Sequence, residues 1–193
     1  MIETTGRYIS LIVALILATI LLSIWSLAAG YVDLSPAELW HSLWLASENP
    51  TRLILLEVRL PRMLLGLLVG GALGLSGAAL QGLLRNPLAE PGLIGVSASG
   101  SLGAVIAIYT GLSAQFPYAL PLLALAFSFG AVFMLHILAG RTKSILTLIL
   151  AGVALSSLAG ALTSLALNLS SDPWAVLEIV FWLMGSLTDR SMI

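Results

Sequence analysis

Polar residues recur at helical spacing near the end of this otherwise apolar sequence. Residues four apart lie on one face of an α-helix, and small or hydroxylated residues repeat at that spacing over 152–164. Such a face either lines a water-filled path or uses its hydroxyls to bond its own carbonyls and neighbouring helices. The candidate pathway residues are Gly152, Ser156, Ser157, Gly160, Thr163 and Ser164.

Two arginines, Arg59 and Arg62, flank Pro61 at the expected start of a membrane span. A cation at the N-terminus of a helix meets the positive end of the dipole, which costs a few tenths to about 1 kcal/mol. The arginines therefore either cover apolar surface and reach lipid headgroups, or contact an acidic partner outside the membrane. We take Arg59 and Arg62 as candidate docking residues.

Small residues also form a ridge at strict four-residue spacing along the helix that follows the arginines. Glycine costs about 1 kcal/mol against alanine inside a helix, which suggests that packing compensates. Small residues let helices approach closely in lipid, where no hydrophobic force drives them together. The pattern predicts a helix surrounded by protein, with Gly66, Gly70, Gly74, Ala78 and Gly82 as its packing ridge.

A charged turn follows the ridge and is bracketed by two prolines. Each proline disfavours helix at the residue before it, so one span must end here and the next begin at once. The turn is either a plain connector or a docking point for a partner subunit. Its candidate residues are Arg85, Asn86, Pro87, Glu90 and Pro91.

These residues must be positioned by membrane helices, because 59% of the chain is hydrophobic, 9% is charged, and the mean hydropathy is +1.07. A span needs about 20 apolar residues. We therefore expect one all-α transmembrane domain over 1–193, a bundle of about five spans with two short helices at the outer interface. The expected spans are 8–29, 61–83, 92–110, 118–138 and 144–166, and the interfacial helices are 36–46 and 173–184.

Several function classes are not expected. The net charge of −1 and the scattered charges provide no basic patch for nucleic acid. No phosphate-binding, zinc-protease or serine-hydrolase motif occurs, so we predict no catalytic residue, metal site or cofactor. His41 and His136 stand alone and are interpreted as structural. No charge lies near the centre of a span, which argues against a carrier driven by buried carboxylates.

Three segments together carry a family resemblance: Arg59-Leu60-Pro61-Arg62, the run from Ser76 to Gln81, and the run Arg85-Asn86-Pro87-Leu88-Ala89-Glu90-Pro91-Gly92-Leu93-Ile94-Gly95-Val96-Ser97. They resemble the FecCD-type permeases of ABC importers, which take up iron siderophores, haem and cobalamin. The resemblance also covers 148–155 and 181–187 and extends from Arg59 to the end of the chain.

The resemblance implies the first half of a ten-helix type II importer permease. It further implies a second permease subunit, cytoplasmic ATPase subunits that hydrolyse ATP, and an extracytoplasmic binding protein. In such permeases the arginines matching Arg59 and Arg62 face the binding protein, and the helix matching 144–166 lines the central path. The resemblance also places the chain in a bacterial or archaeal plasma membrane, surrounded by lipid, with its N-terminus cytoplasmic.

The favoured hypothesis is a permease subunit that imports an iron chelate or a cobalamin-type ligand. Two other functions are alternatives to it. One is a truncated membrane interaction protein that does not transport. The other is an ion-coupled carrier, which would work without ATP.

Overall fold

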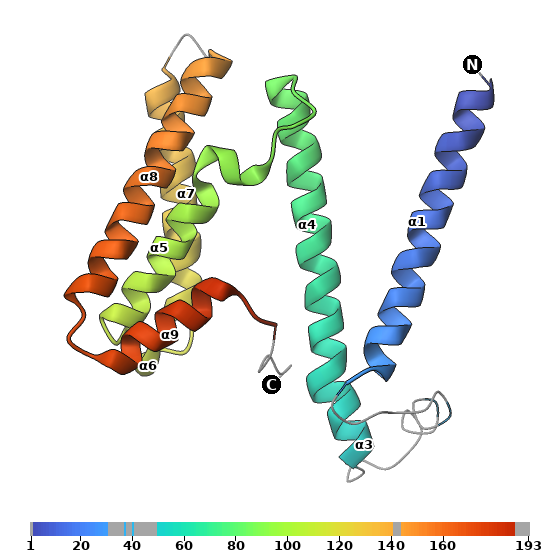
Figure 1. Cartoon of the computed structure of the whole chain (residues 1–193), viewed down its shortest axis with the longest axis horizontal. Helices are drawn as coiled ribbons and strands as arrows, with labels where there is room; N and C mark the ends of the chain where they lie inside the picture. Colours follow the sequence, from blue (N-terminus) through green and yellow to red (C-terminus); the bar gives the residue numbers. More distant parts are fainter. Residues whose placement is uncertain (1, 31–36, 38–39, 41–49, 141–143, 188–193) are drawn as a thin grey trace. The chain divides into compact units, whose positions relative to one another are not determined.

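The computed structural model describes residues 2–30, 37, 40, 50–140 and 144–187, and within these ranges the chain folds into helices joined by short turns (Figure 1). It divides into two compact units, Met1–Gly70 with Leu187–Ile193, and Gly71–Ser186. Four helical stretches in the described part are long and apolar enough to cross a membrane. The architecture is that of the all-α membrane protein expected from the sequence.

The first unit contains α1 (Ile2–Ala28), α3 (Pro50–Leu53), a π-helical turn η1 (Ile54–Arg59) and the beginning of α4 (Leu60–Leu84). The last three form one stretch of 35 residues. The expected interfacial helix 36–46 lies almost wholly outside the described residues.

The helical stretch that contains the second expected span begins at Pro50 and so extends beyond the expected start at Pro61. Pro61 has no N–H for the helical bond and its ring crowds the preceding turn. The wide turn η1 precedes it, and the Leu60 N–H bonds to the Leu55 carbonyl, five residues back. Arg59 and Arg62 thus lie inside a helix, and the helix-dipole penalty assumed for them does not apply.

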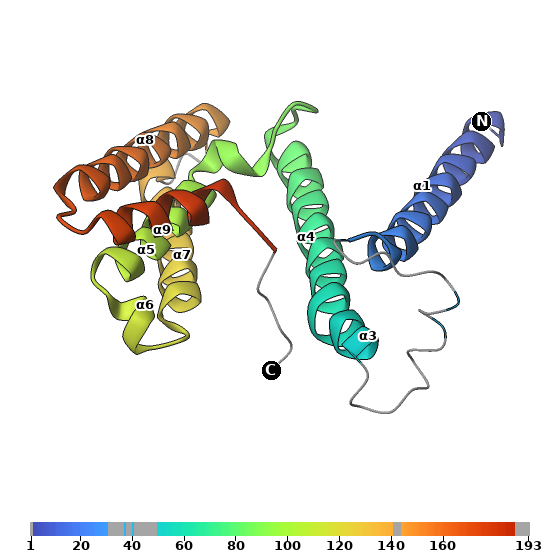
Figure 2. The same cartoon turned by 60° about the horizontal axis from the view of Figure 1, so that its bottom comes forward.

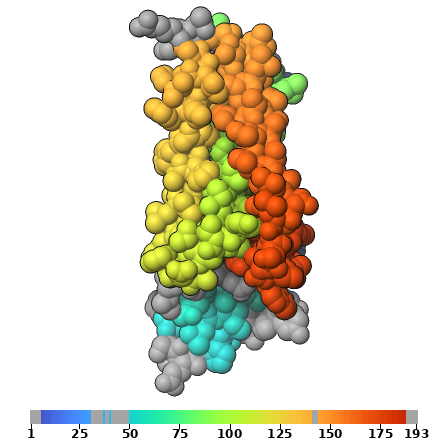
Figure 3. Space-filling model, turned by 90° about the vertical axis from the view of Figure 1, so that its left-hand side faces the viewer, coloured from blue at the N-terminus to red at the C-terminus, as the bar shows by residue number. Residues whose placement is uncertain are grey.

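The second unit is built around α5 (Val96–Tyr109), which packs against three helices of 12 or more residues. These are α7 (Ala119–Ala139), α8 (Ile145–Leu169) and α9 (Pro173–Met184), and α6 (Leu112–Gln115) joins α5 to α7. Figure 2 shows the same helices from a second direction, and Figure 3 shows α7 beside α8 with a strip of α5 between them.

The span expected over 92–110 is divided at Gly95. Pro91–Ile94 form a 3-10 turn, η2, and α5 starts only at Val96. Gly95 has a φ of 73°, a left-handed conformation that glycine adopts without steric cost. With 14 residues α5 is about 21 Å long, shorter than the roughly 30 Å hydrocarbon core.

Helix α9 occupies the range expected for the second short helix. The Trp174 N–H donates to Asp172 Oδ1 at 2.9 Å, which caps the helix, and Pro173 takes the first position. The side chain of Ile179 is completely buried against Val105 and Ile108 of α5. This contact anchors α9 to the bundle of the second unit.

Two glycines let α5 and α7 approach to backbone contact. A Cβ at Gly100 would lie 2.5 Å from Ser128 Oγ and 3.3 Å from the Ala124 carbonyl oxygen, and one at Gly103 would overlap the Leu123 carbonyl oxygen. The packing of this unit therefore depends on the missing side chains at these two positions.

We predict that Gly103→Ala lowers the free energy of unfolding by about 1–3 kcal/mol, because the added methyl forces α5 and α7 apart. The matched control is Gly130→Ala on α7, where a Cβ would meet no atom within 4 Å. Denaturant unfolding in detergent micelles measures the free energy of unfolding of both variants. Equal stability of the two variants would contradict the packing argument.

Candidate docking cleft and polar helix face

The Arg59 side chain is buried, with 8% of its surface exposed. Its Nη1 donates to the carbonyl oxygens of Leu27 and Ala28, each at 2.7 Å. These carbonyls belong to the last turn of α1, where the helix provides no N–H partners. The guanidinium thus also occupies the negative end of the α1 dipole, where a cation is favourable.

Gly30 leaves the space that this guanidinium occupies. A Cβ at Gly30 would lie 2.8 Å from Arg59 Nη2 and 3.1 Å from Cζ. The backbone of Gly30 is not left-handed, so the glycine is needed for space and not for conformation. No local sequence signal indicates this role, because nothing in the sequence joins Gly30 to a residue so far along the chain.

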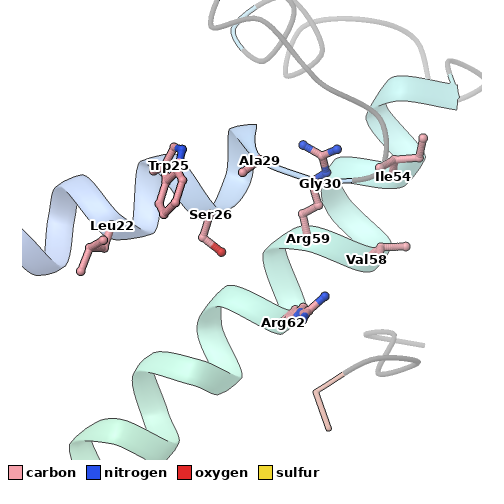
Figure 4. Close-up of a pocket in the computed structure, with 9 residues that line it drawn as sticks. All are labelled: Leu22, Trp25, Ser26, Ala29, Gly30, Ile54, Val58, Arg59 and Arg62. Carbon is pink, nitrogen blue, oxygen red and sulfur yellow. The ribbon is translucent and has the colours of Figure 1, made fainter.

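A cleft of about 790 Å³ lies between the end of α1 and the helix that carries the arginines (Figure 4). Arg62 is exposed at this cleft, whereas Arg59 is buried beside Gly30. The two arginines predicted as a docking pair therefore have different surroundings. The cleft is lined by Leu22, Trp25, Ser26, Ala29, Gly30, Ile54, Val58, Arg59 and Arg62.

The polar face predicted for the fifth span lies on α8 and is largely uncovered in the second unit. Ser157, Gly160 and Ser164 are exposed, and Ser156 and Thr163 are half-buried. A Cβ at Gly160 would meet no atom within 4 Å.

One further residue extends this face. Asn168 is exposed four residues after Ser164, and its Nδ2 donates to the Ser164 carbonyl oxygen at 2.8 Å. The four-residue spacing could have identified Asn168 from the sequence.

Gly152 does not belong to the uncovered face. It is buried, and a Cβ there would lie 2.5 Å from the Leu93 carbonyl oxygen and 2.7 Å from the Ile94 Cα. Conversely, a Cβ at Gly95 would lie 2.8 Å from the Gly152 carbonyl oxygen. The structure therefore places Gly152 in backbone packing between η2 and α8, apart from the exposed residues of the polar face.

The charged turn has a defined backbone. Arg85 has a φ of 48°, and the Asn86 N–H donates to the Gln81 carbonyl at 3.2 Å, which ends α4 in a Schellman motif. The Asn86 Oδ1 accepts the Leu88 N–H at 2.9 Å, and Ala89 is buried. Glu90 is extended before Pro91, as expected for a residue that precedes proline.

The turn borders a hollow of about 480 Å³ that Arg85 and His136 line together. His136 is thus placed near a charged residue and not in a cluster of metal ligands; the described residues contain no group of three that could hold a metal ion. His41 lies outside the described residues.

Most of the α4 ridge lacks close neighbours among the described residues; the exception is Gly66, where a Cβ would lie 3.8 Å from Leu187 Cδ1, in ordinary van der Waals contact. A Cβ at Gly70, Gly74 or Gly82 would meet no atom within 4 Å, and Ala78 is exposed. Its role in helix packing stays a prediction that concerns groups outside the described part of the chain.

The sequence model of the FecCD transport family matches residues 15–192. The chain belongs to this family of multi-pass membrane proteins. It is 41% identical over 160 residues to the ABC transporter permease protein YvrB of Bacillus subtilis, an alignment that covers 78% of the chain and 45% of YvrB.

Two further relatives have named substrates. The molybdate import permease MolB of Haemophilus influenzae is 36% identical over 93% of the chain and 54% of MolB. The vitamin B12 import permease BtuC of Salmonella paratyphi A is 37% identical over 93% of the chain and 52% of BtuC.

A solved structure has the same fold. It is described as an inward-facing conformation of a metal-chelate type ABC transporter, and it matches with a TM-score of 0.80 and 35% identity over 95% of this chain and 55% of its own. The chain spans about half the length of the relatives it matches.

We predict that Gly74→Leu leaves folding of the isolated chain nearly unchanged but prevents accumulation of an assembled permease. Overpacking a buried helix costs about 1 to 3 kcal/mol per site, and this cost arises only when another helix covers the ridge. The control is Leu73→Ile on the neighbouring face. Quantitative membrane immunoblots report assembly, and unchanged accumulation of Gly74→Leu would show that the ridge is not an interface.

Proposed function

We propose that this chain forms one wall of the translocation path in the permease subunit of an ABC importer. The observation that carries the proposal is the uncovered polar face of α8, in a family whose named relatives are import permeases. Hydroxyl and amide groups on a membrane helix are costly against lipid and favourable against water, so this face fits a wet passage.

The proposed ligand is a metal chelate, with an iron siderophore, haem or a cobalamin-type compound as the preferred class. The solved relative described as a metal-chelate transporter and the vitamin B12 permease support this class. The molybdate permease MolB is similarly close, so an oxyanion is the alternative outcome of a ligand screen.

The proposed partners follow from membership of the FecCD transport family. Transport needs a second permease subunit, cytoplasmic ATPase subunits and an extracytoplasmic binding protein, with the N-terminus of this chain cytoplasmic in a bacterial or archaeal plasma membrane. ATP hydrolysis belongs to the ATPase subunits, so this chain is not itself an enzyme.

Blocking the polar face should stop uptake. In a complete permease that carries this segment, Gly160→Leu should reduce ATP-dependent uptake of labelled ferric chelate in liposomes to the level of empty vesicles, because the larger side chain fills the passage. The control is Leu158→Ile, on a residue outside the polar face.

Two outcomes separate the explanations. Normal uptake by a correctly inserted Gly160→Leu permease would contradict the path assignment. ATP-dependent uptake by liposomes that hold only the 193-residue chain with its ATPase and binding protein would show that no second half is needed, contrary to the proposal.

Arg62 is the proposed contact for the binding protein. Arg62→Glu should weaken docking roughly tenfold or more at low salt, because like-charge juxtaposition at an interface costs several kcal/mol. The difference should shrink as salt screens the charges. Surface plasmon resonance on permease in nanodiscs measures it, and an affinity that is equal to wild type at low salt would leave Arg62 as a lipid-facing anchor.

A further inference from the structure

Arg59 has the surroundings of a helix cap. One nitrogen, Nη1, bonds both terminal carbonyls of α1, and 8% of the residue is exposed. A residue that docks a partner must offer its charge at the surface, as Arg62 does. The charge of Arg59 is instead directed into its own chain.

Packing alone gives α1 little support within its unit. No residue in the apolar window of its span, Gly6–Ala28, is buried in the described structure. The hydroxyls of Thr19 and Ser23 bond back to carbonyls of α1 itself, at 2.8 and 2.7 Å. The two hydrogen bonds from Arg59 therefore join α1 to a helix that it otherwise scarcely contacts.

We propose that Arg59 is a positioning residue that ties the last turn of α1 to the helix bearing Arg62, with Gly30 as the space that makes the tie possible. The tie sets the width of the cleft at which Arg62 is presented. Its link to docking rests on the proposed function; the tie itself does not.

The proposal assigns different consequences to the two arginines. Loss of Arg59 frees α1 and disturbs docking indirectly, whereas loss of Arg62 removes a contact and leaves α1 in place. A lysine at position 59 should restore part of the tie, because a single nitrogen makes both bonds.

The position of α1 can be measured in the full chain without any transport partner. The sequence has no cysteine, so nitroxide labels at Ser10→Cys and Val69→Cys are specific. Both sites lie in the first unit, on α1 and α4. Pulsed electron resonance in nanodiscs then gives the distribution of distances between the two helices.

The wild-type chain should give one narrow distance. Arg59→Gln should raise the population at other distances about tenfold or more, since hydrogen bonds from a charged group are lost. Gly30→Val should do the same with Arg59 intact, because the side chain takes the place of the guanidinium. The control Gly6→Val, at a site with no atom within 4 Å, should resemble wild type.

Arg62→Gln should also keep the wild-type distribution, and Arg59→Lys should lie between wild type and Arg59→Gln. Wild-type distributions in both Arg59→Gln and Gly30→Val would overturn the tie. If Arg59→Gln does not fold, Gly30→Val and Arg59→Lys decide the question in the same way.

A docking measurement separates this proposal from the proposed function. Arg62→Gln should flatten the dependence of binding-protein affinity on salt, whereas Arg59→Gln should weaken binding and keep the wild-type slope. Equal flattening by both variants would make Arg59 a direct contact. If Arg62→Gln has no effect on docking, the proposed docking role of Arg62 is wrong. The distance measurement still tests the tie between Arg59 and α1 independently.

Discussion

The last carbonyls of a helix have no N–H partner within the helix, so where they are shielded from water the protein must supply a donor. In the first unit Arg59 supplies that partner for Leu27 and Ala28. The π-helical turn before Pro61 answers the same constraint, because it accommodates a residue that has no N–H to give. The cleft that displays Arg62 is built from these two local solutions.

The second unit meets a related constraint by close approach of backbones. Helices in lipid gain little from burying apolar side chains, so they pack where side chains are smallest. Gly100 and Gly103 permit the contact between α5 and α7, and Gly95 and Gly152 permit the contact between η2 and α8. Glycines in this chain thus mark two kinds of surface, those already used in packing and those left open, such as Gly160 on the polar face.

The difference between these glycines bears on function. The polar face on α8 and most of the small ridge on α4 are exposed in the described structure, and under the proposed function water would cover the first and protein the second. The chain spans about half the length of these relatives. Membership of the FecCD transport family and the open surfaces thus support the same proposal.

The sequence by itself determined the class of protein, the helices with strong local signals and the family. The helix over 173–184 was predictable from the aspartate and proline at its start and the glycine at its end. The left-handed backbone at Gly95 explains why a glycine stands there, but the sequence did not predict that conformation. Tertiary structure alone decided that Arg59 turns inward and that Gly152 is packed against η2. The reason is physical: helix signals act within a few residues, whereas burial of a guanidinium or contact between two backbones depends on residues about twenty or more positions away, which no local pattern records.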